Sequence, residues 1–330
     1  MRDHVVSPRA FLRVAQVNLA VIALNIVSGG AVRLTDSGLG CPDWPTCARH
    51  QLTPPLSLHP VVEFSNRMVV VAVTLVAVVA LVAAWRRAPR RADLTWLAGG
   101  LVAGIVAEAL IGAVVVYSKL NPFAVMTHFV VGIAVLTDAI VLCLRAGRSA
   151  APGRPRVEHR VVVLARTMVV LLFVAVVAGT ATTGTGPHAG GKAAARLHIP
   201  LTDMTRVHSG IVLLLVALTL VTIWTMARTR APEATLDRGR WLVLAMVVQG
   251  MIGYTQYFTH LPALLVGFHV AGAVTVWTAM LWFYDGLFRH EPEPLPRPRP
   301  EVGGAGRQAR AAGDGPDTSS TRVTASRPGR

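Results

Sequence analysis

Long apolar runs, separated by short polar segments, recur along most of this chain. Each run approaches the ~20 residues that an α-helix needs to cross the hydrocarbon core of a bilayer. We predict one transmembrane helix for each of eight runs: Arg13–Leu34, Val61–Trp85, Leu94–Tyr117, Ala124–Leu144, Val161–Thr182, Thr205–Ala227, Trp241–Phe258 and Ala263–Leu287. The first run follows arginines, as a signal peptide does, but no small-residue cleavage site follows it, so we keep it as a helix. The pattern therefore predicts an all-α membrane protein with eight transmembrane helices.

Composition and charge support this interpretation and add an orientation. Only 15% of the residues are charged, against about a quarter in a typical soluble domain. Arginines gather in the alternate connections at 86–91, 145–166 and 228–240. By the positive-inside rule, these connections and both termini are predicted to be cytoplasmic. The net charge of +15 is thus explained without a nucleic-acid partner.

The two halves of the chain share short motifs in the same order. Glu108-Ala-Leu-Ile-Gly112 in the third predicted helix matches Gln249-Gly-Met-Ile-Gly253 in the seventh, and His128 and His269 follow them at the same offset. Because both halves begin on the cytoplasmic side, this is a parallel repeat about an axis along the membrane normal. The expected architecture is two pseudo-symmetric four-helix bundles, and bundle cores commonly hold cofactors.

The predicted organisation has five parts. They are a cytoplasmic N-terminus (1–12), an N-terminal four-helix half (13–145), a cytoplasmic linker (146–160), a C-terminal four-helix half (161–288) and a cytoplasmic tail (289–330). The tail is rich in Pro, Gly, Arg and Ser, a composition that predicts disorder.

The three cysteines divide between two predicted compartments. Cys41 and Cys47 fall in the first external loop, separated by five residues of which two are prolines. An oxidising compartment favours a disulfide between them, and two free thiols are the alternative. Cys143 is expected at the cytoplasmic end of a helix, where packing accounts for it.

Three histidines are predicted to lie at similar depth in the outer parts of their helices: His128, His208 and His269. Ionisable residues inside a membrane span are costly and usually functional. His208 and His269 belong to the second and fourth helices of the C-terminal half. Two imidazoles on facing helices are a natural axial pair for one haem iron. Interhelical hydrogen bonding by each histidine is the alternative.

The N-terminal half has a different set of candidate ligands. Its His128 is accompanied by Asn66, a poor iron ligand, at the position that corresponds to His208. One firm ligand and one weak position suit a haem that must enter, react and leave. Glu63 lies three residues before Asn66, on the same helical face, where it could handle a proton or orient a water. The alternative is a solvated acid in the first turn of a helix.

Five other charged residues either depart from the positive-inside distribution or lie inside predicted helices. Arg33, Arg67 and Arg206 fall on the predicted external side, where they could pair with the anionic propionates of haem. Glu108 and Asp138 are acids inside predicted helices, and the sequence leaves both hydrogen bonding and proton transfer open for them.

Several of these motifs resemble those of bacterial haem A synthases. The first external loop carries the likeness most specifically, in Arg33-Leu-Thr-Asp-Ser-Gly-Leu-Gly-Cys-Pro-Asp-Trp-Pro-Thr-Cys47. Thr183-Gly-Thr-Gly-Pro-His-Ala-Gly190 resembles the third external loop of that family. Thr205-Arg-Val-His-Ser209 and Gly267-Phe-His-Val-Ala-Gly272 resemble its haem-ligand helices. The resemblance covers about residues 11 to 288.

The resemblance implies an oxidoreductase that uses a bound haem b. Its substrate would be haem O and its product haem A, formed by oxidation of the ring C8 methyl to a formyl group in two successive hydroxylations. His208 and His269 would ligate the haem b iron, and His128 would ligate the substrate haem. Glu63 would be the essential acid.

The chain departs from the family pattern at two places. Many members have Glu-x-x-His-Arg in the second helix, whereas this chain has Glu63-Phe-Ser-Asn-Arg67, similar to high-GC Gram-positive members. Asn66 and Arg67 are then the implied contacts to the substrate haem beside His128. The second departure is Gly191-Lys192, where an acidic residue often stands in the family.

The resemblance also implies a multi-pass protein of the cell membrane, surrounded by lipid. It allows contact with a haem O synthase, with cytochrome oxidase assembly factors, or with a second copy of the chain. The main alternative is a dihaem cytochrome b subunit that transfers electrons; it predicts two histidine pairs, which Asn66 opposes. A transporter with pseudo-symmetric halves predicts Gly/Pro-broken helices near mid-membrane, whereas the polar groups here cluster at the external ends.

Overall fold

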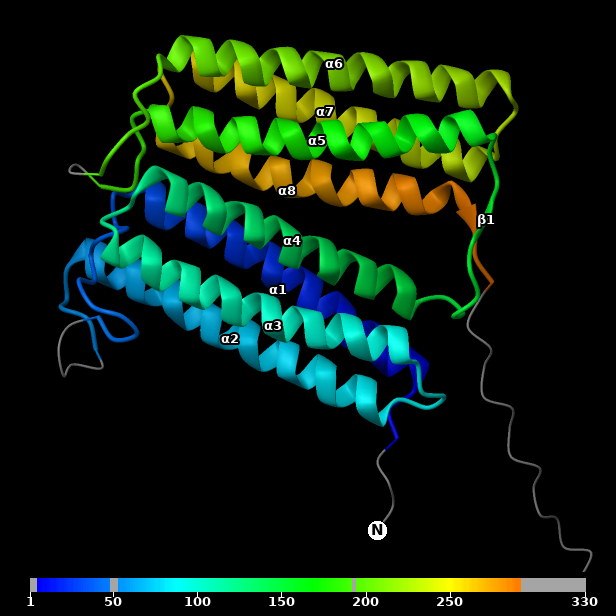
Figure 1. Ribbon diagram of the computed structural model, residues 1–330, viewed down its shortest axis with the longest axis horizontal. Helices are drawn as coiled ribbons and strands as arrows, with labels where there is room; N and C mark the ends of the chain where they lie inside the picture. Colours follow the sequence, from blue (N-terminus) through cyan, green and yellow to red (C-terminus); the bar gives the residue numbers. More distant parts are fainter. Residues whose placement is uncertain (1–4, 48–52, 192–193, 292–330) are drawn as a thin grey trace, which may run out of the picture. The chain divides into compact units, whose positions relative to one another are not determined.

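The computed structural model describes residues 5–47, 53–191 and 194–291. Within them, eight α-helices run side by side (Figure 1). The helices are α1 (Pro8–Leu34), α2 (Leu58–Arg86), α3 (Ala92–Tyr117), α4 (Pro122–Ala146), α5 (His159–Thr185), α6 (Leu201–Arg228), α7 (Glu233–Phe258) and α8 (Ala263–Gly286). Two short strands, β1 (Arg154–Pro155) and β2 (Phe288–Arg289), complete the secondary structure of this part of the chain.

Most helices begin earlier than hydropathy predicts, because their first turns carry polar residues and prolines. The side chain of Ser7 accepts a hydrogen bond from the backbone of Ala10 and caps α1, with Pro8 as its first residue. Asn121 caps α4 in the same way, followed by Pro122. Such caps satisfy amide groups that have no partner inside the helix. Hydropathy detects only the apolar stretch that follows them.

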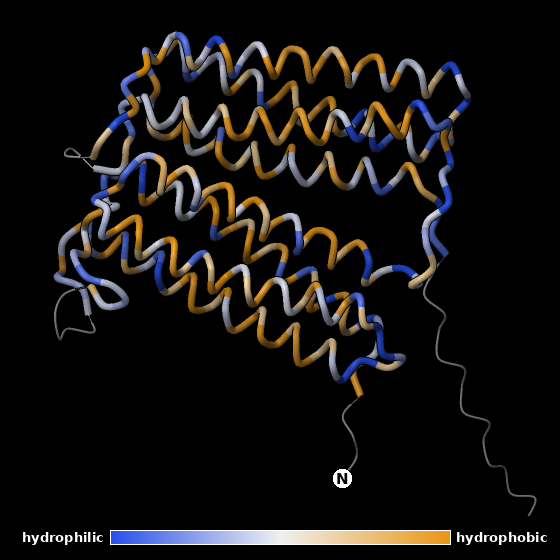
Figure 2. The backbone as a smooth tube through the Cα atoms, viewed as in Figure 1, coloured by the Kyte–Doolittle hydropathy of each residue, from blue (hydrophilic) through white to orange (hydrophobic). Residues whose placement is uncertain are grey.

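Seven of the eight described helices are long and apolar enough to cross a membrane, and α7 is the exception. Gln249 and Gln256 interrupt its apolar stretch, and its first turns carry charged residues. Figure 2 shows hydrophobic helix middles between more hydrophilic ends. Large apolar side chains such as Leu75, Leu110 and Leu213 point outward, with more than half of their surface exposed. The chain is therefore a multi-pass membrane protein, and a span for α7 stays a prediction.

The helices pack mainly with their neighbours in sequence. Helix α1 packs against α2 and α4, and α3 contacts both α2 and α4; the contacts α5–α6, α6–α7, α7–α8 and α5–α8 repeat this arrangement. Contacts of α1 with α8, and of α4 with α5 and α8, join the two groups. All eight helices belong to one compact unit, whose fully buried side chains include Leu101, Leu136, Met168 and Phe283.

The turns α3–α4 and α7–α8 have matching backbone geometry. Each contains two consecutive residues in the left-handed region: Lys119 and Leu120 (φ 54° and 63°), and His260 and Leu261 (φ 64° and 61°). Each turn also repeats the same three backbone hydrogen bonds to the end of the preceding helix. Non-glycine residues seldom adopt this conformation, so its recurrence at matched places supports the predicted repeat. The pseudo-symmetry of two complete bundles stays a prediction.

The connections between helices lie at two ends, which we name by their chemistry. Among the described residues, the disulfide end contains 35–47, 53–57, 118–121, 186–191, 194–200 and 259–262, and the arginine end contains 87–91, 147–158 and 229–232.

At the arginine end, the linker after α4 pairs with the segment after α8. Strand β1 lies antiparallel to β2, with Arg154 opposite Arg289. Arg148 forms an ion pair with Asp285 and a hydrogen bond with His290. The prediction of a disordered tail from residue 289 therefore began too early, because backbone pairing and ion pairs order the first residues. Residues 292–330 of that tail lie outside the described residues.

Candidate functional site

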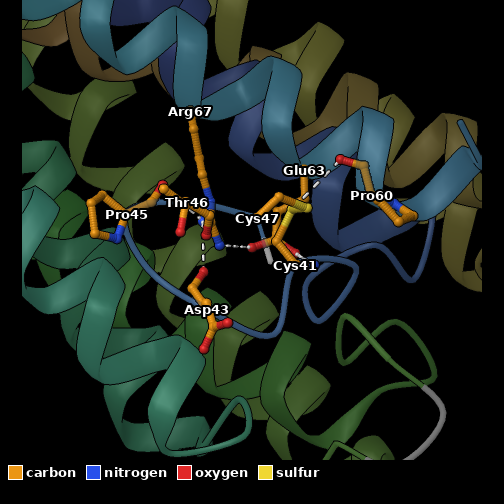
Figure 3. The surroundings of a disulfide bond; sticks show 8 residues. All are labelled: Cys41, Asp43, Pro45, Thr46, Cys47, Pro60, Glu63 and Arg67. Carbon is orange, nitrogen blue, oxygen red and sulfur yellow. Dashed lines mark hydrogen bonds and ion pairs between the residues drawn. A yellow bond between two sulfur atoms is a disulfide. The ribbon is translucent and has the colours of Figure 1, made fainter. Parts of the chain in front are cut away.

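The loop after α1 is closed by a disulfide bond between Cys41 and Cys47, as predicted (Figure 3). Both cysteines are fully buried. The backbone amide of Cys41 donates a hydrogen bond of 2.8 Å to Oε2 of Glu63 in α2. The loop therefore folds back onto the start of α2, and Glu63 is one of its anchors.

Arg67, one helical turn after Glu63, is the second anchor of this loop. Its Nη1 donates to the carbonyl oxygens of Asp43 (2.8 Å), Pro45 (3.1 Å) and Thr46 (2.8 Å). Its Nη2 lies 2.6 Å from Oε1 of Glu63. Figure 3 shows the guanidinium pointing into the loop between these groups. Arg67 was predicted to contact the substrate haem, but its Nη1 is engaged by loop carbonyls and its Nη2 by Glu63.

Glu63 is not a solvated acid. Only 6% of its surface is exposed, and both carboxylate oxygens have partners, Arg67 on one side and Cys41 on the other. The helix begins at Leu58, so Glu63 lies in the second turn rather than the first. Asn66, predicted to share its face, accepts a hydrogen bond of 2.8 Å from Ser28 in α1.

A second set of contacts joins the disulfide loop to the connection after α5. Arg33, at the end of α1, donates to the carbonyl of Thr183 (2.9 Å) and to that of His188 (2.6 Å). The amide of Gly38 donates to the carbonyl of Gly190 at 3.0 Å. Arg33, predicted as a propionate contact, therefore links the end of α1 to the end of α5 and to the connection that follows α5.

His208 and His269 face each other across the second group of helices. Their ring centroids are 6.4 Å apart, with an angle of 73° between the ring planes. If each imidazole bonded one metal ion at about 2 Å, as in zinc sites, the centroids would lie roughly 6 Å apart. Nδ1 of His208 bonds to the carbonyl of Ala175 at 2.9 Å. Nδ1 of His269 is buried and has no hydrogen-bond partner among the described residues.

Glycines make room for both rings. A Cβ at Gly179 of α5 would lie 3.1 Å from Cε1 of His208, and a Cβ at Gly253 of α7 would lie 3.0 Å from Cε1 of His269. The described residues hold no group of three or more His, Cys, Asp or Glu side chains arranged to bind a metal ion. Two facing imidazoles instead suit an iron that brings its own equatorial ligands, as haem iron does. The residues present therefore fit haem.

His128 has different surroundings from the facing pair. Its Nδ1 lies 3.2 Å from Oε2 of Glu108 in α3, and its side chain is 40% exposed. His128 and His269 lie at the same distance from the starts of α4 (Pro122) and α8 (Ala263), which agrees with the predicted repeat.

The remaining candidate residues are Arg206, Asp138 and Lys192. Arg206 is the most exposed of the predicted propionate contacts, with 81% of its side chain accessible and Asp203 3.5 Å away. Asp138 lies on the part of α4 that faces Gly100 of α3. Lys192, at the second departure from the family pattern, lies outside the described residues.

Comparison with known proteins assigns the family. A family model described as "COX15-CtaA: Cytochrome oxidase assembly protein" matches residues 13–190, just over half of the chain. The chain belongs to the COX15-CtaA family. The matched segment runs from α1 into the connection after α5 and ends at residue 190, so it contains the disulfide loop, Glu63, Arg67 and His128.

Several curated relatives carry the name Heme A synthase. The protein from Lysinibacillus sphaericus is 34% identical over 136 residues, 41% of this chain and 44% of the relative. That from Geobacillus thermodenitrificans is 30% identical over 138 residues (40% and 43%), and that from Symbiobacterium thermophilum is 31% identical over 153 residues (46% and 50%). The aligned part of the chain thus spans half or less of the length of these relatives.

The disulfide of this COX15-CtaA protein gives a direct chemical prediction. In protein isolated without reductant and then denatured, Cys143 should react with an alkylating reagent, because it is the free cysteine of the described residues. Cys41 and Cys47 should react only after reduction, since their sulfurs are bonded to each other. Peptide mass mapping of the labelled cysteines provides the measurement. Alkylation of both loop cysteines before reduction would contradict the bond.

Proposed function

We propose that this chain is a haem A synthase that oxidises haem O to haem A. The observation that carries the proposal is the facing pair His208 and His269 in a COX15-CtaA protein whose disulfide loop is anchored on a buried acid. Curated relatives named Heme A synthase support the assignment of the reaction.

In this proposal the two halves of the helical unit have different tasks. His208 and His269 would hold haem b, and a haem bound there would supply electron transfer. His128 would receive haem O in the N-terminal half. Asn66 occupies the position that corresponds to His208 in the predicted repeat. Two four-helix bundles of similar plan would supply one permanent site and one exchangeable site. His128 lies beside the carboxyl group of Glu108, whereas Gln249 contacts His269 at the matching place, and this difference supports the division.

The proposed reaction is a four-electron oxidation of a methyl group. A first hydroxylation with water gives a hydroxymethyl group and releases two electrons and two protons. A second gives a geminal diol, which loses water to leave the formyl group. The sum is R–CH₃ + H₂O → R–CHO + 4 H⁺ + 4 e⁻, so the reaction needs an external acceptor for four electrons.

The chain's own residues would manage protons and orientation. Glu63 would stabilise positive charge at the oxidised carbon or take a proton from the attacking water. For this it would have to exchange its contacts with Arg67 and Cys41. Arg206 is the exposed cation best suited to a propionate, and Arg33 and Arg67 would contribute through the loops that they hold.

We further propose that the protein lies in the cell membrane with the disulfide end outside. The arginine end and both termini would then be cytoplasmic, as the positive-inside rule predicts. The disulfide between Cys41 and Cys47 supports this orientation, because such bonds persist in oxidising compartments.

The proposal is tested by expressing the full chain in a host that makes haem O but lacks a haem A synthase. Extracted haems are separated and identified by mass. We expect haem A to appear with the wild-type chain and to be absent from cells with the empty vector. If a stably inserted chain yields no haem A, the synthase assignment fails, and a dihaem electron-transfer protein becomes the better account.

A further inference from the structure

The acid nearest to His128 is a residue that the proposed reaction does not use. Oε2 of Glu108 lies 3.2 Å from Nδ1 of His128, within ion-pair distance. The contact does not have the geometry of a hydrogen bond. Neither Nδ1 of His128 nor Oε1 of Glu108 has a hydrogen-bond partner among the described residues. Alignment of Nδ1–H with the carboxyl oxygen would turn this contact into a hydrogen bond.

The matched position in the other half lacks this arrangement. Gln249 corresponds to Glu108 in the internal repeat, but its Nε2 donates to the backbone carbonyl of His269 at 2.9 Å rather than to the ring. Nδ1 of His269 is left without a partner. The two repeats therefore place a polar side chain at the same point and direct it differently. Only the N-terminal half puts a carboxyl group beside the imidazole.

Local packing holds the Glu108–His128 pair in place. A Cβ at Gly112, one turn after Glu108, would lie 3.7 Å from Cε1 of His128. A Cβ at Gly132, one turn after His128, would lie 3.7 Å from Oε2 of Glu108. Helices α3 and α4 thus meet through small residues at this level, and close approach of this kind fixes the distance between side chains on the two helices.

We propose that Glu108 is a positioning residue that accepts the Nδ1–H of His128 when His128 ligates the substrate haem through Nε2. This rests on the proposed haem O site in the N-terminal half. Histidines that bind metals commonly donate their second N–H to a carboxylate or carbonyl, which fixes the tautomer and raises the basicity of the ligand. His128 would have such a partner, whereas His269 would not. Glu108 would therefore give the histidine ligand of the reacting haem a carboxylate partner that His269 lacks.

The test uses the purified full-length protein with its haem b, to which haem O is added in detergent. Glu108→Leu removes the acceptor, and Glu108→Gln keeps an acceptor oxygen without the carboxylate. Gln249→Leu is the matched control, because it removes a polar group from the corresponding position of α7. Haem O affinity is measured by titration of the Soret band, and retained haem O and haem b are counted by extraction and mass.

We expect Glu108→Leu to weaken haem O binding about 10–100-fold, the usual effect of losing such a partner. Glu108→Gln should recover part of the affinity and still shift the haem O reduction potential upward, since a less basic imidazole stabilises ferric iron less. Gln249→Leu should leave haem O affinity and potential unchanged. A purely structural role of Glu108 would not shift the potential in the Gln variant.

Three results would overturn the proposal. They are unchanged haem O affinity and potential in Glu108→Leu, an equal loss of haem O in Gln249→Leu, and haem O binding that survives His128→Ala. None of these measurements needs turnover. A chain that binds haem O through His128 and Glu108 but makes no haem A would end the synthase assignment and leave this proposal standing.

Discussion

His208→Ala and His269→Ala should each abolish the low-spin b-type haem spectrum of the purified protein. The two rings face each other at 6.4 Å between centroids, so either substitution removes one of the two proposed ligands. A haem iron with one remaining histidine loses its low-spin state or the haem itself. The helices should still insert, because α6 and α8 remain long and apolar without these side chains. Absorption spectra of the reduced protein provide the measurement.

Two controls make this result specific. His198→Ala changes an exposed histidine outside the helices and should leave the spectrum intact. His128→Ala should also retain the b-type signal, because His128 belongs to the other group of helices. A normal low-spin spectrum in both His208→Ala and His269→Ala, at wild-type protein levels, would exclude this pair as the haem b ligands.

The arrangement of this pair was largely predictable from sequence. Equal depth within the helices and the internal repeat place His208 and His269 on the second and fourth helices of one half, and the structure brings their rings together. What sequence could not provide is the environment of each ring. The bond from His208 to the Ala175 carbonyl uses a backbone acceptor, which every residue type possesses and no motif marks.

The same reason explains why the roles of Arg33 and Arg67 were incomplete in the sequence analysis. An arginine near a predicted haem site suggests a propionate partner, yet both donate to backbone carbonyls at the disulfide end. These acceptors are distant from the two arginines in sequence. They come within hydrogen-bond distance only when the helices pack, so no local motif marks them. The i,i+4 spacing of Glu63 and Arg67 was the one available signal, because residues so spaced are neighbours on a helix.

Helix α7 shows where hydropathy reaches its limit. Its apolar run was predicted as a span, but Gln249 and charged first turns lower its hydropathy. In a bundle, Gln249 can point inward to another helix, as its bond to the His269 carbonyl shows. The mean hydropathy of a segment cannot separate residues that face lipid from residues that face protein. Gln249 lowers the mean hydropathy of α7, yet it contacts another helix of the same group.

Glu63→Gln should produce the largest loss of haem A among the substitutions in the N-terminal half. Loss of a positioned base typically lowers the rate by 10²–10⁴-fold. We expect cells to accumulate haem O or a hydroxylated intermediate, while the haem b spectrum is retained because the proposed haem b ligands lie on α6 and α8. Asn66→His should be milder, because many family members carry His there. The measurement is the haem profile of cells without another haem A synthase.

The anchoring role of Glu63 has to be separated from chemistry, since the residue also holds the disulfide loop. Arg67→Leu releases three loop carbonyls, whereas Glu63→Gln keeps an acceptor for the Cys41 amide. If Glu63 is the essential acid, Arg67→Leu should speed reduction of the disulfide more than Glu63→Gln does, while Glu63→Gln lowers haem A more. The same order in both measurements would mean that Glu63 acts through the loop. Wild-type haem A in Glu63→Gln would end its catalytic role, because a carboxylate needed for proton transfer cannot be replaced by an amide without loss of rate.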